Sequence, residues 1–92
     1  MSKIQQAFEM IEALLRGEYE PLQFSCDMED FLCDNSSAME QENAEVNDVL
    51  QNDIPDLCSE GEPGFDPEHM IQGIKAEYEK AKALINKQKK AR

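Results

Sequence analysis

The chain has 92 residues, which suffices for one domain with a modest core, because folding at this length buries only about 60–65% of the unfolded chain's surface. Hydrophobic residues at 40% and charged residues at 32% are typical of a folded protein, and the formal net charge of -11 argues against binding to nucleic acid or to anionic membranes. No stretch without a charged residue exceeds six residues, which excludes a membrane-spanning helix of about 20 residues.

The first expected helix covers about residues 3–16. Apolar side chains recur at spacings of three and four from Ile4 to Leu15, which places them along one side of a helix. Ser2 can cap the start of this helix, and Gly17 supplies the left-handed residue that commonly ends one.

The second expected helix covers about residues 21–33 and begins with Pro21, whose missing N–H is no loss in a first turn. One face carries a row of large apolar side chains: Phe24, Met28, Phe31 and Leu32. The opposite side groups Leu22, Cys26 and Cys33. A helix that is apolar on two sides either lies between other helices or offers one side to a partner.

The third expected helix covers about residues 38–53, after a turn at residues 34–37. Ser37 and Glu40 have the spacing of a capping box at its start. Its apolar positions are sparse, so most of this helix should face solvent or a partner. Ile54 precedes Pro55 and should leave the helical conformation, which would end the helix there.

The fourth expected helix covers about residues 67–88, with Asp66 as cap and Pro67 in the first turn. Its apolar positions repeat at three and four: Ile71, Ile74, Tyr78, Ala81 and Ile85. A basic tail at about residues 87–92 complements the negative end of the helix dipole. No segment alternates apolar and polar residues as a strand would, so the chain is expected to be all-α, a small antiparallel four-helix bundle in a single domain of residues 1–92.

Catalytic chemistry is not expected, and neither is a cofactor. The only histidine, His69, lies beside acidic Glu68 with no nucleophile pattern near it, so we expect an exposed or half-buried surface residue. A Cys3His zinc site would use Cys26, Cys33, Cys58 and His69. Structural zinc ligands usually come in pairs that are close in the sequence, and these four residues do not. The three cysteines are instead predicted to be small core residues with reduced thiols. With no apolar signal-peptide core after Met1, the protein is expected in the cytoplasm.

The distribution of charge is the most informative feature. Residues 17–74 contain sixteen Asp and Glu and no Lys or Arg, whereas residues 75–92 contain seven basic residues. Acidic runs often serve only solubility. Twelve carboxylates without a cation between residues 27 and 62 exceed what solubility requires, and such a surface speeds encounter with a basic protein.

The whole layout resembles the colicin D-type immunity proteins, including those of contact-dependent growth inhibition systems. The resemblance lies in an opening amphipathic helix, the turn at residues 17–20 that leads to Phe24 and Phe31, an acidic third helix, the segment at residues 53–58 with its acidic loop, and a long last helix containing Glu77 and Tyr78. It implies a cytoplasmic inhibitor that protects the producing cell from a cognate toxin, often a nuclease and frequently one that cuts tRNA.

The resemblance also implies that carboxylates occupy the groove in which the toxin would hold RNA phosphates. By position, the expected toxin-binding residues are Glu45, Asp48, Asp53, Asp56, Glu60 and Glu62. The expected partner is the basic toxin domain, with no nucleic acid or membrane bound and a monomeric free protein. The alternative is an acidic nucleic-acid mimic or adaptor that binds a basic host protein, and an enzyme ranks third.

Overall fold

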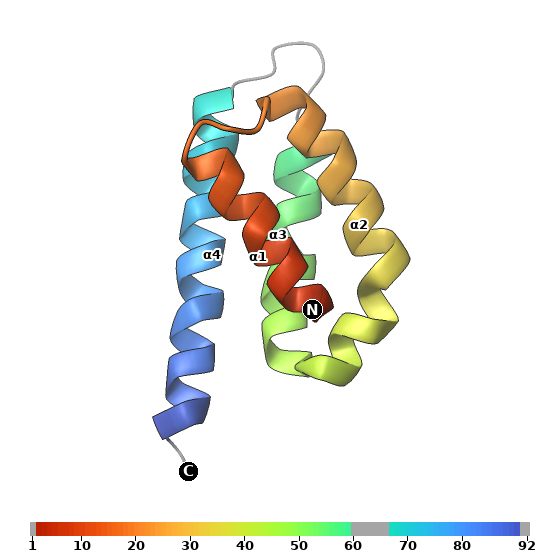
Figure 1. Cartoon of the computed structure of the whole chain (residues 1–92), viewed down its shortest axis with the longest axis vertical. Helices are drawn as coiled ribbons and strands as arrows, with labels where there is room; N and C mark the ends of the chain where they lie inside the picture. The colour runs from red at the N-terminus through yellow and green to blue at the C-terminus, as the bar shows by residue number, and fades with distance from the viewer. Residues whose placement is uncertain (1, 60–66, 91–92) are drawn as a thin grey trace.

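The computed structural model describes residues 2–59 and 67–90, with only the backbone described at residues 53, 56–59 and 90. Within these ranges the chain is all-helical, without strands, and comprises four helices: α1 (Lys3–Leu15), α2 (Pro21–Glu42), α3 (Ala44–Ser59) and α4 (Pro67–Lys90) (Figure 1). The all-α prediction is therefore confirmed for the described residues. None of their helices is long and apolar enough to cross a membrane.

The ends of α1 follow the sequence signals. The Ser2 hydroxyl accepts a hydrogen bond from the N–H of Gln5 at 3.0 Å. At the other end Gly17 adopts a φ of 78°, and the next residue, Glu18, donates its N–H to the carbonyl of Ala13. Glycine suits this position because a Cβ is strained at positive φ.

The predicted turn at residues 34–37 is wrong, because α2 continues as a helix to Glu42. The fully buried Met39 extends the row of Phe24, Met28 and Leu32 on the same face, so a longer helix buries one more large apolar side chain. Polar residues of the segment 34–37 can form hydrogen bonds within the helix. The Asn35 side-chain amide donates to the carbonyl of Phe31, one turn earlier. The burial of Met39 therefore outweighs the weak preference of residues 34–37 for a turn.

The actual junction between α2 and α3 is Asn43. Its backbone is extended, with φ of -166° and ψ of 95°. Its side-chain oxygen accepts from the N–H of Val46 at 3.3 Å, so Asn43 takes the capping role that the sequence assigned to Ser37. The Asn43 and Gln88 amides also exchange two hydrogen bonds, at 2.7 and 3.1 Å, which tie this junction to α4.

The predicted end of the third helix before Pro55 is also wrong. Helix α3 runs through Pro55 to Ser59. Val46, Leu50 and Ile54 repeat every four residues and are fully buried, so continuing the helix keeps Ile54 in the core. This burial outweighs the hydrogen bond and the backbone freedom that a proline removes from a helix.

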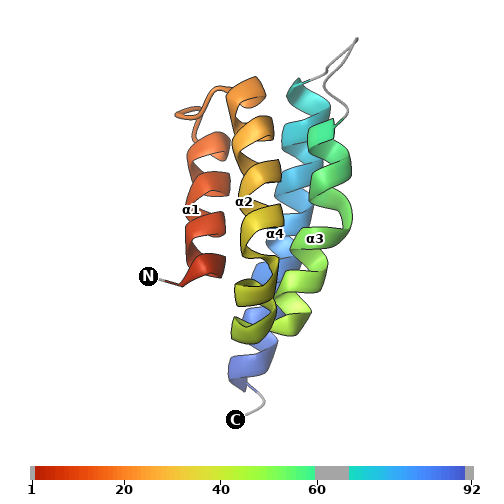
Figure 2. The ribbon, with the colours of Figure 1, turned by 90° about the vertical axis from the view of Figure 1, so that its right-hand side faces the viewer.

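The four helices share one core (Figure 2). Helices α1 and α3 lie on opposite sides, and each packs against both α2 and α4. The radius of gyration, 12.9 Å, is close to the value of about 12 Å expected for a compact domain of this length. The largest fully buried side chains are Phe24, Ile11, Met28, Leu32, Met39, Leu50, Ile54, Met70, Ile74 and Val46.

Candidate partner-binding surface

Part of the acidic charge serves the fold. Glu42, at the end of α2, accepts hydrogen bonds from the backbone N–H groups of Lys3 at 2.9 Å and Ile4 at 3.1 Å. These groups belong to the first turn of α1, which has no helical acceptors for its N–H groups and carries the positive end of the helix dipole. Burial opposes ionisation of Glu42, but the hydrogen bonds outweigh it and lower the pKa of this carboxyl.

Two further carboxylates accept hydrogen bonds from tyrosine hydroxyls. Tyr19 donates to Asp27, and Tyr78 donates to Glu12 across the contact between α4 and α1. Burial and the neighbouring carboxylate together raise the pKa of each tyrosine to about 12. The hydrogen bonds from Tyr19 and from Gln23 lower the pKa of Asp27. Asp27 and Glu12 therefore hold the chain together and are poorly placed to receive a partner.

Three more carboxylates also have structural roles. Glu20 caps α2 by accepting from the N–H of Gln23 at 2.7 Å. Glu18 pairs with Arg16 at 3.0 Å, and the buried Glu77 pairs with Lys80 at 3.1 Å.

The carboxylates left over on α2 and α3 form the candidate site, which we call the acidic surface. All are exposed, and none forms an ion pair with another described residue. The acidic surface consists of Glu29, Asp30, Asp34, Glu40, Glu45 and Asp48. Because residues 17–74 contain no Lys or Arg, no cation of α2 or α3 can neutralise it.

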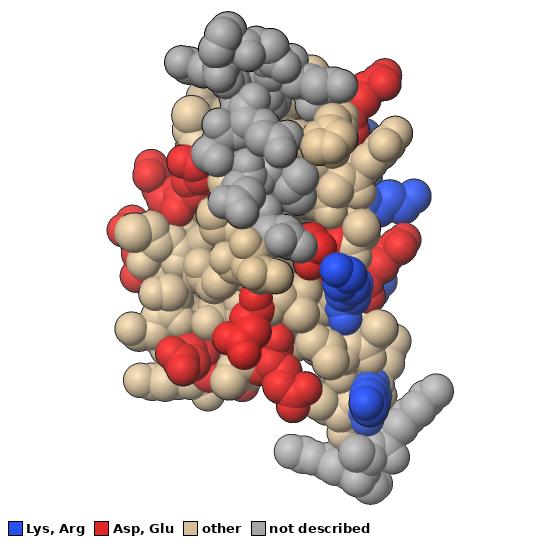
Figure 3. Space-filling model, turned by 180° about the vertical axis from the view of Figure 1, so that it is seen from behind, with Lys and Arg blue, Asp and Glu red and all other residues tan. Residues whose placement is uncertain are grey.

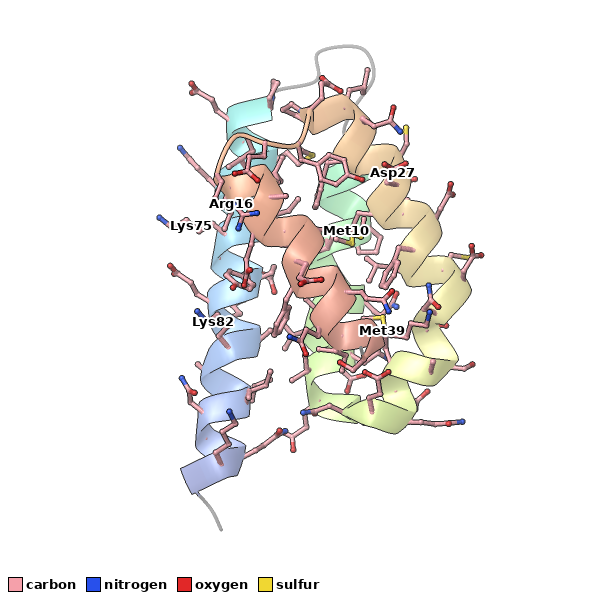
Figure 4. All side chains as sticks on the ribbon, viewed as in Figure 1. Met10, Arg16, Asp27, Met39, Lys75 and Lys82 are labelled. Carbon is pink, nitrogen blue, oxygen red and sulfur yellow. The ribbon has the colours of Figure 1, made fainter. Side chains whose placement is uncertain are left out.

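The lysines lie on another side of the molecule. In Figure 3 red atoms gather over the α2 side and over the beginning of α3, and blue atoms follow α4 at the right. Lys75 and Lys82 point outward from α4, away from the other helices (Figure 4). Lys82 also lies 5.2 Å from the centre of the Tyr78 ring, which stabilises its position. Carboxylates also lie among the lysines along α4 (Figure 3), so the described part of the chain has one side, formed by α2 and α3, whose charged residues are all acidic, and one side of mixed charge along α4.

No family model, curated protein or solved structure matches this chain. The acidic surface must therefore be interpreted from its own geometry and chemistry. The likeness to immunity proteins stays a prediction from sequence pattern.

The structure brings together two of the six predicted binding residues. Glu45 and Asp48 are exposed and lie one turn apart on the same side of α3. Asp53 and Asp56 belong to the continuous helix and not to a broken helix end, and their side chains lie outside what is described. Glu60 and Glu62 fall outside the described residues altogether.

The sequence prediction missed the carboxylates of α2. The sequence pattern places the contact on the third helix, its end and the following loop, so it omits Glu29, Asp30, Asp34 and Glu40, which the structure places on one continuous helix. A signal for this face was present in the spacing of Leu22, Cys26 and Cys33, which lies opposite the buried row.

The prediction that the cysteines are core residues is wrong for two of them. Cys26 and Cys33 are free thiols on the exposed face of α2, while the side chain of Cys58 is not described. Within the described residues, no three His, Cys, Asp or Glu side chains gather closely enough to hold a metal ion. His69 is exposed, as the sequence indicated.

Proposed function

We propose that this protein binds and neutralises a cognate bacterial toxin, a nuclease, by covering its basic active site with the acidic surface. The action is binding and not catalysis. The scaffold that we propose for it is an antiparallel four-helix bundle, monomeric and cytoplasmic. The observation that carries the proposal is that exposed carboxylates gather on α2 and α3, where no cation neutralises them.

The chemistry of a nuclease supports this choice of partner. A groove that holds the phosphates of RNA is lined by lysine and arginine, because these side chains bind polyanions. Carboxylates placed in such a groove form charge-assisted hydrogen bonds, which are stronger than neutral ones. The same contact excludes the substrate, so binding and inhibition are one event.

The separation of charge across the molecule supports a defined orientation of docking. The side formed by α2 and α3 is attracted to a basic partner. Helix α4, from which Lys75 and Lys82 point outward, is repelled by it. Glu45 and Asp48 belong to the proposed contact, and Asp53, Asp56, Glu60 and Glu62 stay predicted members of it.

Co-expression with a candidate toxin, one whose gene directly precedes the gene of this protein, tests the function. Cells that produce the protein should survive the toxin, whereas cells with an empty vector should arrest. Reversal of two charges in Glu45→Lys/Asp48→Lys should abolish protection. The matched variant Glu9→Lys/Glu79→Lys changes net charge equally on exposed positions of α1 and α4 and should still protect. Survival no better than the empty vector with the unaltered protein would remove the proposal.

A purified complex tests the electrostatic mechanism. Association should slow steeply as salt rises, because long-range attraction between the surfaces is screened. An association rate that does not depend on salt would contradict steering by the acidic surface. Binding to a basic host protein and to no toxin would favour the adaptor alternative.

A further inference from the structure

A shallow groove lies between α3 and α4. Its volume is about 350 Å³, and the described residues that line it are Val49 on α3 and Lys80, Ala83, Leu84 and Lys87 on α4. Val49 and Leu84 are only half-buried. The floor of the groove is therefore made of apolar side chains that stay partly in contact with water.

The two rims of this groove carry opposite charges. Glu45 is exposed and lies one turn before Val49, on the same side of α3, whereas Lys87 lines the groove from α4. The hydrogen-bonded amides of Asn43 and Gln88 tie α3 to α4 within two residues of both, so the two charges face each other at the same level. Among the described residues, neither takes part in an ion pair. Figure 3 shows red atoms over the beginning of α3 and blue atoms along α4, with a strip of tan atoms between them.

The order of these charges decides what can occupy the groove. A wholly cationic surface would meet Lys87, and a wholly anionic one would meet Glu45, so the groove suits a surface that carries both charges in the reverse order. A second copy of the chain, rotated by half a turn about an axis along the groove, presents such a surface. Its α4 then lies over α3 of the first copy, and its α3 lies over α4. Glu45 of each copy faces Lys87 of the other, so positive and negative charges alternate around the contact.

We infer that this groove is a self-association site, through which two copies of the chain form a symmetric dimer. Val49 of each copy covers Ala83 and Leu84 of the other, and the pair of Glu45 with Lys87 forms twice. The groove is short, so the contact is smaller than the about 1,600 Å² of a typical stable interface. The net charge of -11 on each copy also opposes the approach. The dimer is therefore weak, and its population rises with protein concentration.

Self-association bears on the proposed function because Glu45 also belongs to the proposed toxin contact. A copy whose Glu45 faces a second copy does not present it to a toxin, so toxin and second copy exclude each other. The monomer remains the form that binds the toxin, and the dimer is a reserve that dissociates as toxin is bound. This exclusion rests on the proposed function, whereas the self-association itself does not.

Sedimentation equilibrium at about 0.3 M sodium chloride, where the screening length is about 6 Å and net repulsion is reduced, tests the dimer. The unaltered protein should show a monomer–dimer equilibrium with a Kd below about 1 mM. Glu45→Lys or Lys87→Glu places like charges in both pairs, so each should weaken association at least about tenfold. Glu9→Lys and Lys75→Glu make the same changes of net charge at exposed positions outside the groove and should stay within about threefold. Unaltered protein that stays monomeric at about 1 mM would overturn the inference.

Mixing the two groove variants separates contact between copies from an effect within one copy. A copy with Glu45→Lys and a copy with Lys87→Glu again have opposite charges in both facing pairs. The equimolar mixture should therefore form a heterodimer with a Kd within about threefold of the unaltered protein, although each variant alone associates poorly. Circular dichroism checks that both variants stay helical. A mixture of two folded variants that associates no better than its components would overturn the inference.

Failure of the inference can be told apart from failure of the proposed function. If the mixture associates and the unaltered protein neutralises no toxin, the dimer stands and the inhibitor function is wrong. If the protein protects cells but is monomeric at about 1 mM, the function stands and the dimer is wrong. Toxin added to the dimer should yield complexes with one copy of the protein, and a complex that retains two copies would overturn the exclusion.

Discussion

Glu42 joins the end of α2 to the beginning of α1, to residues 39 and 38 positions away in the sequence. Its carboxylate accepts from Lys3 and Ile4 at 2.9 and 3.1 Å and so caps α1 from the end of α2. Ser2, the residue immediately before α1, caps the same helix end by accepting from the N–H of Gln5. The two caps satisfy different N–H groups of the first turn, so the loss of one is not compensated by the other.

Replacing Glu42 by alanine should lower the free energy of unfolding by about 1 kcal/mol, the usual effect of removing a helix cap. Urea denaturation at neutral pH measures this change. Glu40→Ala is the matched control, because Glu40 is exposed near the same helix end and caps nothing. If both variants lost the same amount, the cap would not contribute.

The contribution of Glu42 should also depend on pH. Its pKa in the folded protein lies below the ordinary value of 4.5, so its stabilising effect is fully present above about pH 4.5 and is lost as pH falls through the lower folded pKa. The difference in unfolding free energy between wild type and Glu42→Ala should therefore shrink at acid pH. A difference that stays constant well below pH 4.5 would contradict this.

The two tyrosines predict a loss of stability at alkaline pH. Burial and the nearby carboxylates raise the pKa of Tyr19 and Tyr78 from 10.0 to about 12. Stability from each hydroxyl is thus fully present below pH 10 and is lost as pH rises through about 12. The near-ultraviolet absorbance of tyrosinate should rise in the folded protein only near pH 12. Tyr78→Phe should leave half the change in absorbance, and a midpoint near pH 10 would contradict the burial of the hydroxyls.

At the scale of the elements, α2 differs most from its prediction. Its second half is held from outside the helix, because the Gln51 side chain of α3 donates to the carbonyl of Leu32 at 2.9 Å. Met39 is fully buried further along the same helix. Contacts from distant residues therefore keep residues 34–37 helical although Asp, Asn and Ser favour turns.

Ser36→Pro distinguishes a continuous helix from a turn. In the middle of α2 a proline removes a hydrogen bond and clashes with the preceding turn, so it should cost about 3 kcal/mol or more. Urea denaturation gives this change, and circular dichroism reports the loss of helix. Ser36→Ala is the control and should stay within about 0.5 kcal/mol of wild type. A stable Ser36→Pro protein would indicate a turn at residues 34–37.

At the scale of the whole molecule, the exposed carboxylates reduce stability. Asp30 and Asp34 are one turn apart on α2, and like charges at this spacing destabilise a helix by about 0.2–0.5 kcal/mol. The repulsion adds to that of a net charge of -11. A surface that is unfavourable in the free protein becomes favourable when a cationic partner covers it.

Added salt should therefore stabilise the free protein, because it screens this repulsion. Asp30→Asn should raise the free energy of unfolding by about 0.2–0.5 kcal/mol at low salt and by less at high salt. Thermal unfolding over a range of sodium chloride concentrations measures both effects. A melting temperature that falls with salt would show that attractive pairs dominate the surface.

The sequence predicted four helices, and several of their ends, from local signals. Ser2, Gly17 and Pro21 act through the backbone of their own turn, so their effect can be predicted without knowledge of the fold. The periodicity of apolar residues likewise marked the buried faces. For the candidate site, exposure was predicted correctly for Glu45 and Asp48, whereas the carboxylates of α2 were missed.

By itself the sequence determined the helical class, the order of acidic and basic segments and the apolar face of each helix, because these depend on neighbours within one or two turns. Only the tertiary structure decided that α2 continues to Glu42, that α3 passes through Pro55 and that Cys26 and Cys33 face outward. The physical reason is that burial of Met39 and Ile54 against other helices outweighs the local preference of a few residues for a turn. The size of that burial depends on partners elsewhere in the chain.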